Sequence, residues 1–351
     1  MKNTIFLFCP LNLLSFASFS QEKPTNVILM IGDGMGLPQI TTSIYFKDSP
    51  SNFEQFTDIG FIKTSSTSHK VTDSAAGATA FATGQKSYNR AISVSPDSVR
   101  LETILEKLEA KNYNTGLISL TTITHATPAC FYAHVTDRDM HEEIAEQLTN
   151  SGVDFFAGAG LDYFTKRKDG KDFYKTLEEK GYSMDSVKLV TNPYPDKKYG
   201  HLLAATEMPA KTKGRGDYLP DATELALNYF KSPNEPFFLM VEGSYIDWAG
   251  HANDAEMLIQ EELDFDKTIG VVLNFLKENP NTLLVITADH ETGGVAVGKG
   301  KSADELSIYF TTDQHTAELI PVFSMGRGSE LFRGIYENNE IYHKLATILK
   351  L

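Results

Sequence analysis

Residues 26–36 read NVILMIGDGMG, so that an unbroken apolar run stops at a glycine-rich turn that carries Asp33. Two later apolar runs stop in the same way, and the residues that follow them are Glu242, Asp289 and His290. Short, continuously apolar runs that alternate with helix-like segments are typical of buried parallel strands, and ligands bind at the carboxyl ends of such strands. We therefore expect an α/β protein with a site at one edge of its sheet.

The fold class that this pattern predicts is a three-layer α/β sandwich, in which helices flank a central, mostly parallel sheet. A chain of 351 residues is long enough for one large domain or two smaller ones. No internal repeat or interdomain linker divides it, which favours a single domain over residues 21–351. Between residues 166 and 216, Lys, Asp, Tyr and Pro are frequent and periodicity is weak, which predicts a small exposed surface insertion.

The first 20 residues have the features of a secretory signal peptide. Lys2 precedes a mostly apolar stretch over residues 5–19, and polar residues follow it. This stretch is too short and interrupted to span a bilayer comfortably, and no later stretch approaches the ~20 apolar residues that a spanning helix needs. We therefore expect a periplasmic or secreted protein with no transmembrane segment in the mature chain. Cys9 would leave with the signal peptide, so that Cys130 has no partner for an intrachain disulfide.

The chain is strongly acidic, with 46 Asp and Glu against 32 Lys and Arg and a formal net charge of -14. It has no basic stripe with interleaved aromatic residues, and an acidic surface repels polyanions, so we expect no nucleic-acid-binding module. A small anionic substrate would need local cations to overcome its repulsion by this acidic surface. Bound divalent metals and a well-placed arginine can supply them.

Residues 242–251 read EGSYIDWAGH and place Asp247 and His251 four residues apart, on one face of a helix. Zinc accepts such oxygen and imidazole ligands. Alone, a pair of this kind is more often a helix cap or a surface pair, and an isolated His315 would be a satisfied core histidine. The acid and histidine at residues 289–290 change this balance, because all these residues together supply enough ligands for a catalytic metal site.

Residues 72–84 read TDSAAGATAFATG, with polar capping residues, a helical body of small residues and a terminal glycine. Ser74 would lie in the first turn of this helix. It is either a simple cap or a nucleophile, because a helix amino terminus favours an alkoxide and an anionic group. Arg138 is likewise either an ordinary surface residue or, through its planar fork, a grip for two oxygens of a tetrahedral oxyanion.

Two glycine-rich stretches are similar to nucleotide-binding loops but do not complete the pattern. The third glycine of G-x-G-x-x-G would fall at Leu37. Residues 293–299 are followed by Gly300, where a phosphate-binding P-loop has Ser or Thr. Neither stretch is therefore expected to bind a nucleotide.

Several motifs together resemble the alkaline phosphatase family, and they occur in the family's order from the first strand almost to the end of the chain. They are residues 31–36 (IGDGMG), 73–76 (DSAA), 125–129 (HATPA), 242–251 (EGSYIDWAGH), 288–294 (ADHETGG) and 314–316 (QHT). The resemblance implies a catalytic domain that hydrolyses small phosphate monoesters at alkaline pH through a phosphoserine intermediate. It also favours a homodimer.

The same resemblance implies two zinc ions and one magnesium ion. Their expected ligands are Asp247, His251 and His315 for the first zinc, Asp33, Asp289 and His290 for the second zinc, and Asp33, Thr127 and Glu242 for magnesium. Ser74 would be the nucleophile beside the second zinc, and Arg138 would bind the phosphoryl oxygens. The paired zinc ions would stabilise the attacking and leaving oxygens.

Two positions depart from the familiar bacterial pattern, which has Asp where His125 stands and Lys where Trp248 stands. Both residues are expected near the substrate or the third metal. His125 can coordinate metals that a water-holding Asp would not, so the identity of the third metal is left open. Trp248 offers only one neutral donor, and the missing ammonium should weaken phosphate binding.

Other functions share parts of this pattern. A phosphodiesterase or sulfatase of the same superfamily keeps the metal ligands, but a sulfatase needs Pro and Arg at fixed places after its nucleophile. Here residues 75–78, AAGA, follow Ser74. Diesterase relatives commonly use Thr as the nucleophile, and a noncatalytic zinc- or phosphate-binding protein would have no use for Ser74. A phosphomonoesterase is therefore the predicted function.

Overall fold

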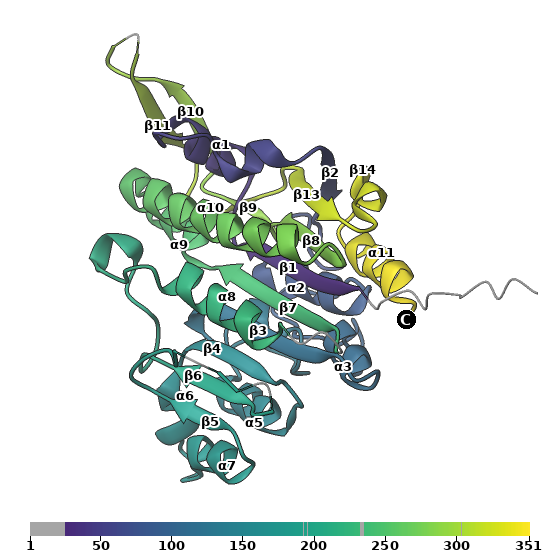
Figure 1. The fold of residues 1–351 in the computed structure, drawn as a ribbon. Coiled ribbons are helices and arrows are strands. Elements are labelled where there is room, and N and C mark those ends of the chain that lie inside the picture. Colours follow the sequence, from purple (N-terminus) through teal and green to yellow (C-terminus); the bar gives the residue numbers. More distant parts are fainter. Residues whose placement is uncertain (1–24, 192, 195, 232–234, 303) are drawn as a thin grey trace, which may run out of the picture.

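A large sheet runs through the molecule, and helices cover both of its faces (Figure 1). The structure, a computed structural model, describes residues 25–191, 193–194, 196–231, 235–302 and 304–351. The expected signal peptide and Cys9 lie outside these residues. Within the described residues the sheet has ten strands, in the order β14-β2-β13-β8-β1-β7-β3-β4-β6-β5.

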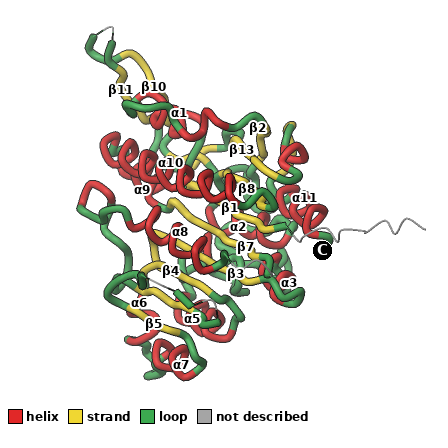
Figure 2. Tube along the Cα trace, viewed as in Figure 1, coloured by secondary structure: helices red, strands yellow, loops and turns green. Residues whose placement is uncertain are grey.

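Strands and helices alternate along much of the chain (Figure 2). The strands of the large sheet are β1 (Asn26–Gly32), β2 (Asp58–Lys63), β3 (Asn114–Thr122), β4 (Phe155–Ala159), β5 (Ser183–Asp185), β6 (Tyr199–Leu202), β7 (Phe237–Gly243), β8 (Thr282–Thr287), β13 (Ile320–Gly326) and β14 (Gly334–Glu337). Two small antiparallel pairs join β9 (Glu291–Thr292) with β12 (His315–Thr316) and β10 (Val295–Lys299) with β11 (Leu306–Phe310).

The helices vary in length from single turns to one long amphipathic helix, α10. They are α1 (Leu37–Tyr45), α2 (Ser74–Thr83), α3 (Ile104–Glu109), α4 (Ala126–Ala129), α5 (His141–Asn150), α6 (Leu161–Thr165), α7 (Phe173–Glu179), α8 (Tyr218–Tyr229), α9 (Tyr245–Ala252), α10 (Ala255–Glu278) and α11 (Glu340–Leu349). Short 3-10 turns lie at Asn52–Gln55, Lys211–Lys213 and Ser329–Phe332.

Most of the sheet is parallel. The neighbouring strands from β8 through β1, β7, β3, β4 and β6 to β5 all run in one direction. β13 is antiparallel to both β8 and β2, and β14 is parallel to β2. The apolar runs that predicted buried parallel strands are β1, β7 and β8, and every residue of β7 and β8 is buried. The predicted three-layer α/β sandwich is confirmed.

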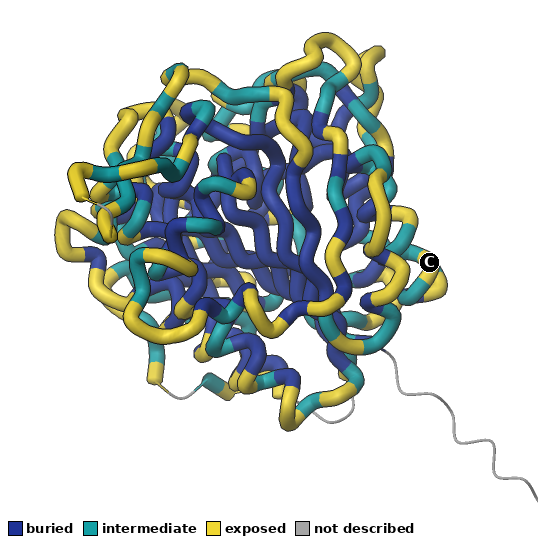
Figure 3. The backbone as a smooth tube through the Cα atoms, turned by 90° about the horizontal axis from the view of Figure 1, so that it is seen from above, coloured by how far each residue is buried: buried dark blue, intermediate teal, exposed yellow. Residues whose placement is uncertain are grey.

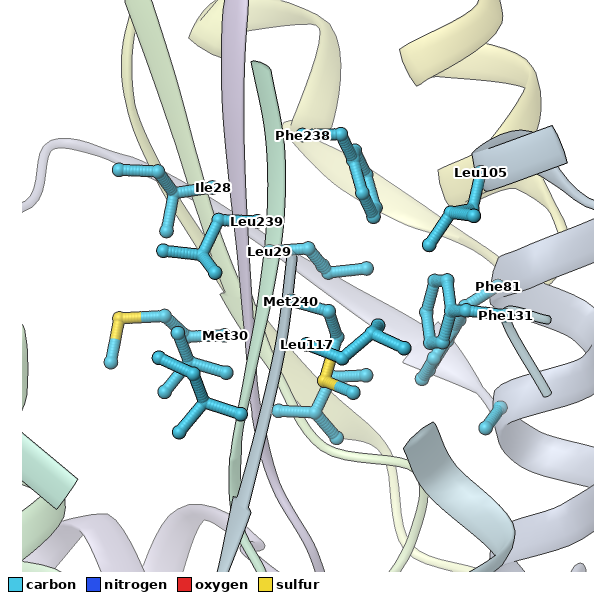
Figure 4. Close-up of a cluster of buried hydrophobic side chains, with 14 of the residues drawn as sticks. Ile28, Leu29, Met30, Phe81, Leu105, Leu117, Phe131, Phe238, Leu239 and Met240 are labelled. Carbon is cyan, nitrogen blue, oxygen red and sulfur yellow. The ribbon is translucent and has the colours of Figure 1, made fainter. Parts of the chain in front are cut away.

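The core fills the space on both sides of the central strands, where successive side chains point to opposite faces (Figure 4). Met30 and Leu239 point to one side, and Leu29 and Met240 point to the other. On that second side they meet large side chains of the helical layer, including those of Phe81, Leu105 and Phe131. Buried residues occupy the middle of the molecule, and exposed residues lie on its rim (Figure 3). The sheet is therefore a rigid base for residues at its strand ends.

The segment from residue 166 to 216 requires a correction to the predicted exposed insertion. It contains α7 and also supplies β6 and β5, which extend the sheet beyond β4. Tyr199, His201 and Leu202 of β6 are buried, whereas the loop between β5 and β6 is mostly exposed or half-buried. A strand of 4 residues is too short to show a periodic pattern in the sequence. Pairing with β4 stabilises it instead.

Among the described residues, no helix combines the length and the apolar character that crossing a bilayer requires. Cys130 is a free, buried thiol. The hairpin of β10 and β11 projects from the body of the protein beyond α1 (Figure 1).

Candidate metal centre

The carboxyl ends of β1, β7 and β8 bring acids and a histidine together at one edge of the sheet. The parallel register aligns Ile31 with Glu242; Asp33 follows β1 directly, and Asp289 and His290 follow β8 after one intervening residue. All four polar residues have no exposed surface. Burial, above all, raises the pKa of each carboxyl group, to about 7 for Glu242. So many buried acids are costly to ionise unless cations accompany them.

α2 begins at Ser74, as the sequence predicts, and its amino terminus lies against the end of β8. Asp73 caps the helix, and its carboxylate accepts a hydrogen bond from a backbone N–H of the first turn at 3.0 Å. The approach is close, because a side-chain carbon at Gly77 would lie 2.8 Å from Cβ of Asp289. This packing places Oγ of Ser74 3.3 Å from Nε2 of His290.

The first predicted ligand group, Asp247, His251 and His315, comes from α9 and β12. Oδ1 of Asp247 lies 3.4 Å from Nε2 of His251 and 3.5 Å from Nε2 of His315. The two Nε2 atoms are 3.1 Å apart. Each Nδ1 atom faces a backbone carbonyl oxygen, that of Asp313 at 2.6 Å for His251 and that of Thr72 at 2.9 Å for His315. The structure therefore brings the whole group together.

These carbonyl groups indicate where the ring protons of His251 and His315 lie. A carbonyl oxygen only accepts hydrogen bonds, so Nδ1 carries a proton in both rings, and in the neutral form of each ring the lone pair is on Nε2. The two lone pairs face each other, and both face a carboxylate oxygen. These three electron-rich groups repel one another unless a cation lies between them. Two imidazole nitrogens and one carboxylate oxygen form a ligand set that zinc accepts.

The second predicted group, Asp33, Asp289 and His290, lies beside Ser74. Nε2 of His290 is 3.3 Å from Oδ2 of Asp289 and 3.5 Å from Oδ1 of Asp33. Oδ1 of Asp289 accepts hydrogen bonds from the backbone N–H groups of Gly34 at 3.3 Å and His290 at 3.0 Å. Both carboxylate oxygens of Asp33 and Oδ2 of Asp289 are buried without a hydrogen-bond partner. A bound cation would satisfy them.

A third group shares Asp33 with the second and adds Glu242 and His125. Ligand atoms of these three residues lie within 4.8 Å of one another. Oε2 of Glu242 accepts a hydrogen bond from Oγ of Ser119 at 2.6 Å, while its Oε1 is buried without a partner. Oγ1 of Thr127, in α4, is also buried without a partner. His125, expected near the substrate or the third metal, lies among the acids of the expected magnesium site.

Arg138 is held between the helix cap and the third group. Its Nη1 donates to Oδ2 of Asp73 at 3.2 Å, and its Nη2 donates to Nε2 of His125 at 3.0 Å. Burial, reinforced by this guanidinium, holds the pKa of His125 well below its usual range, so the ring is neutral. Because Asp73 directly precedes Ser74, these contacts keep a positive charge close to the start of α2.

Trp248 lies on α9 directly after Asp247. Its half-buried ring packs against Tyr245, and the ring centroids are 4.6 Å apart. Among the described residues, no hydrogen bond or ring contact joins the indole to a side chain of the three ligand groups. Its effect on phosphate binding therefore stays a prediction.

Three further residues take part in the site without being predicted as site residues. Asp73 holds Arg138, Ser119 donates to Glu242, and Thr292 contacts ligands of both the first and the second group. A polar residue within the buried strand β3 is a weak signal for Ser119. The only sequence signal for Thr292 is its position shortly after the predicted ligands Asp289 and His290. This signal is too unspecific to predict a site residue.

Comparisons with known proteins agree with this geometry. Residues 24–308 match the sequence profile of the family described as "Alkaline phosphatase". Alkaline phosphatase 4 of Bacillus subtilis (strain 168) is 30% identical over 414 residues, which cover 93% of this chain and 88% of the relative. Alkaline phosphatase 3 of the same organism is 36% identical over 323 residues, covering 87% of this chain and 68% of the relative.

Solved structures extend the similarity to the fold. The alkaline phosphatase from the Antarctic bacterium TAB5 has 48% sequence identity and a TM-score of 0.91, covering 93% of this chain and 98% of that chain. A mutant of the TAB5 enzyme, in which a histidine is replaced by aspartate, has Mg bound in a site called M3. It has 49% identity and a TM-score of 0.90, with the same coverage of 93% and 98%.

Proposed function

The chain belongs to the alkaline phosphatase family, which makes it a phosphoric monoester hydrolase, and from this premise we propose how its residues carry out the reaction. Ser74 is the nucleophile, Arg138 binds the phosphoryl group, and the three ligand groups hold divalent metals. The observation that carries this proposal is the set of buried carboxylate oxygens without partners, next to imidazole lone pairs that face each other. Bound cations would stabilise such an arrangement.

The first and second groups have donor sets suited to zinc, and each supplies three protein ligands. The third group combines the oxygens of Asp33, Glu242 and Thr127 with the nearby ring of His125. Oxygen donors suit magnesium, whereas imidazole suits zinc and other transition metals. In the TAB5 relative, a mutant with aspartate in place of a histidine holds Mg in the M3 site. We therefore assign a magnesium-type third site, at which His125 would coordinate a transition metal only if Arg138 no longer donated to its Nε2.

The reaction has two displacement steps at phosphorus. Oγ of Ser74 bonds to phosphorus, the bond from phosphorus to the ester oxygen breaks, and the alcohol leaves with a proton. Water then attacks the phosphoserine, the bond from phosphorus to Oγ breaks, and inorganic phosphate leaves as Ser74 regains its proton. Arg138 donates to two phosphoryl oxygens in both steps. Zinc, when bound, would lower the pKa of the Ser74 hydroxyl and of the attacking water, and would neutralise developing charge.

The cellular setting belongs to the same proposal. Residues 1–20 direct export and are removed, and residues 21–351 act as one catalytic domain in the periplasm or outside the cell. The active form is a homodimer that acts on small phosphate monoesters. The composition of the amino-terminal residues supports export, and the family supports the catalytic domain and the homodimer. The mass and the N-terminal sequence of the exported protein test the removal of residues 1–20.

A panel of three chromogenic esters tests the proposed activity. The purified mature protein, with its metal content measured, is assayed on a phosphate monoester, the matching phosphate diester and the matching sulfate ester. We expect rapid turnover of the monoester and far slower turnover of the other two. Preference for the diester or the sulfate would assign the chain a different activity within the superfamily, and no turnover of any ester would indicate a noncatalytic binding protein.

The phosphoserine is tested separately by intact-mass analysis after acid quenching with substrate. Wild-type protein should gain the mass of one phosphoryl group, and Ser74→Ala should gain none. Ser68→Ala, in the exposed loop before α2, is the matched control and should behave as wild type. Equal phosphorylation of the Ser74→Ala protein would remove Ser74 from its role.

A further inference from the structure

Thr292 occupies a confined position between the first and second ligand groups. It ends β9, pairs with His315 of β12, and has no exposed surface. Two glycines approach it closely, because a Cβ at Gly34 would lie 2.8 Å from Oγ1 of Thr292 and a Cβ at Gly250 would lie 2.9 Å from its Cγ2. Gly34 also has a φ of +74°, which favours glycine. The turn after β1 and α9 therefore hold the threonine in place.

The hydroxyl of Thr292 contacts one ligand of each proposed zinc group. Its Oγ1 lies 2.5 Å from Oδ1 of Asp247 and 3.2 Å from Nδ1 of His290. The same Oδ1 atom faces the Nε2 atoms of His251 and His315. One side chain that is not itself in either ligand group thus joins the two groups.

The number of available protons decides the direction of these two hydrogen bonds. An ionised Asp247 can only accept, so Thr292 donates its single hydroxyl proton to Asp247 and accepts from N–H at Nδ1 of His290. The neutral His290 ring then has its lone pair on Nε2, the atom that lies 3.3 Å from both Ser74 Oγ and Asp289 Oδ2. The opposite tautomer would direct an N–H, instead of a lone pair, toward Ser74 and Asp289, so the ring could not serve as a metal ligand there.

We infer that Thr292 is a positioning residue that couples the two proposed zinc groups, because one hydrogen-bond chain through its hydroxyl orients Asp247 and selects the tautomer of His290. The inference rests on the proposed function, in which these residues hold zinc. Partners that orient metal ligands commonly contribute about 10- to 100-fold to metal affinity. Since Thr292 contacts both groups, its loss should weaken both.

Two variants separate the hydroxyl from the packing of the side chain. Thr292→Val keeps the shape and removes the hydroxyl, and Thr292→Ser keeps the hydroxyl. Thr268→Val is the matched control, because Thr268 is also buried but its hydroxyl donates only to the carbonyl of Asp264 within α10. A defect that appears in Thr292→Val but not in Thr292→Ser is therefore due to the lost hydroxyl.

The first measurement uses metal-free protein. Ring-nitrogen chemical shifts of His290, assigned by their loss in His290→Asn, distinguish a proton on Nδ1 from one on Nε2. Wild type, Thr292→Ser and Thr268→Val should carry the proton on Nδ1, whereas Thr292→Val should lose this preference. An unchanged tautomer in Thr292→Val overturns the inference.

The second measurement is zinc affinity, obtained by competition with a chelator. Thr292→Val should bind both zinc ions about 10- to 100-fold more weakly, and Thr292→Ser should bind them as wild type does. Equal affinities in wild type and Thr292→Val, or a loss confined to one of the two zinc ions, overturn the inference while leaving the proposed function intact. Wild-type protein that binds no zinc instead overturns the proposed function, which is a different outcome.

Discussion

Two clusters of largely buried charged side chains differ in how their charges are paired, one made of Lys211, Arg215, Glu261 and Asp264 beside α10, and one at the carboxyl edge of the sheet. Beside α10, the side chains of Arg215, Glu261 and Asp264 are each 1% exposed. Arg215 donates to Glu261 at 3.0 Å and to Asp264 at 2.9 Å, and Lys211 donates to Asp264 at 2.6 Å. Two cations and two anions therefore balance each other within the chain.

The carboxyl edge of the sheet lacks such a balance. Asp33, Glu242 and Asp289 are fully buried and retain oxygens without partners. The guanidinium of Arg138 lies nearby but donates to Asp73 and to a histidine rather than to these acids. Both clusters bear the cost of burying charge, but only the cluster of Lys211, Arg215, Glu261 and Asp264 offsets it with its own residues. The difference indicates that the acids at the sheet edge depend on cations from outside the chain.

Removal of metals should have the largest effect and should act on the sheet edge alone. Chelation should abolish turnover and lower the melting temperature, because the acids at that edge repel one another without cations. Zinc should restore activity, and magnesium should add to it. The measurements are turnover, residual metal content and thermal unfolding. Full activity in a preparation shown to be free of metal would contradict the conclusion that the acids at the sheet edge depend on cations.

Arg215→Met tests the balanced cluster of buried charges beside α10. Breaking a buried, balanced ion pair leaves an unpaired acid and typically costs about 3–5 kcal/mol of unfolding free energy. Denaturant unfolding of the metal-loaded protein measures this loss. Zinc content per folded molecule should not change. Lys267→Met, which removes a half-exposed surface partner of Asp217, is the control and should cost about 1 kcal/mol or less.

Arg138→Ala should lower kcat/KM by about 10- to 1,000-fold, equivalent to roughly 1.5 to 4 kcal/mol of charge-assisted hydrogen bonding to the phosphoryl group. Inorganic phosphate should also inhibit the variant less than wild type. Steady-state kinetics and phosphate inhibition constants check this, with zinc content as the control. Unchanged kinetics would place Arg138 outside the reaction and leave the sheet edge without a substrate-binding cation of its own.

The pH dependence of stability should differ between metal-free and zinc-loaded protein. Burial raises the pKa of Glu242 to about 7 in the metal-free fold. A raised folded-state pKa contributes stability that is fully present below the unfolded-state pKa of the carboxyl group and is lost as pH rises through the folded-state value. The melting temperature of metal-free protein should therefore fall by a few degrees as pH rises through about 7.

Glu242→Gln is the matching variant for this pH test. It removes the titrating carboxyl group and should flatten the fall in melting temperature of the metal-free protein. Zinc-loaded wild type should not show the same fall, because bound cations favour the ionised acids. An equally steep fall in metal-free Glu242→Gln would assign the effect to other acids of the edge.

Trp248→Lys should have the smallest effect. An added ammonium beside Asp247 would attract the dianionic product, so the phosphate inhibition constant should fall by a modest factor. Trp248→Phe keeps an aromatic ring against Tyr245 without a charge and is the control. Zinc content and folding must match wild type before the constants are compared across pH. Phosphate binding no tighter than in wild type would show that this position does not act on phosphate.

The sequence predicts the parts of this protein that local patterns encode. Unbroken apolar runs identify β1, β7 and β8, because strands buried on both faces need apolar side chains at every position. Capping residues and small residues identify α2, with Ser74 in its first turn. By contrast, β5 and β6 are too short to show periodicity, and they form because β4 offers an unpaired edge for hydrogen bonding.

The predicted ligand sets are only partly a matter of sequence. Asp247 and His251 lie one helical turn apart, so their shared face follows from the chain itself. His315 joins them because β12 pairs with β9, and no local pattern around His315 predicts that pairing. Likewise, His125 lies with Asp33 and Glu242 only because α4 packs at the end of β3.

The sequence by itself therefore determines the α/β class, the family and the identities of the residues at the strand ends. Only the tertiary structure decides which of their oxygens lack partners, where the histidine protons lie, and that Thr292 connects the two proposed zinc groups. The physical reason is that strand and helix signals depend on neighbouring residues. Proton positions and unpaired oxygens depend instead on carbonyl and hydroxyl groups far along the chain, such as Thr72 beside His315.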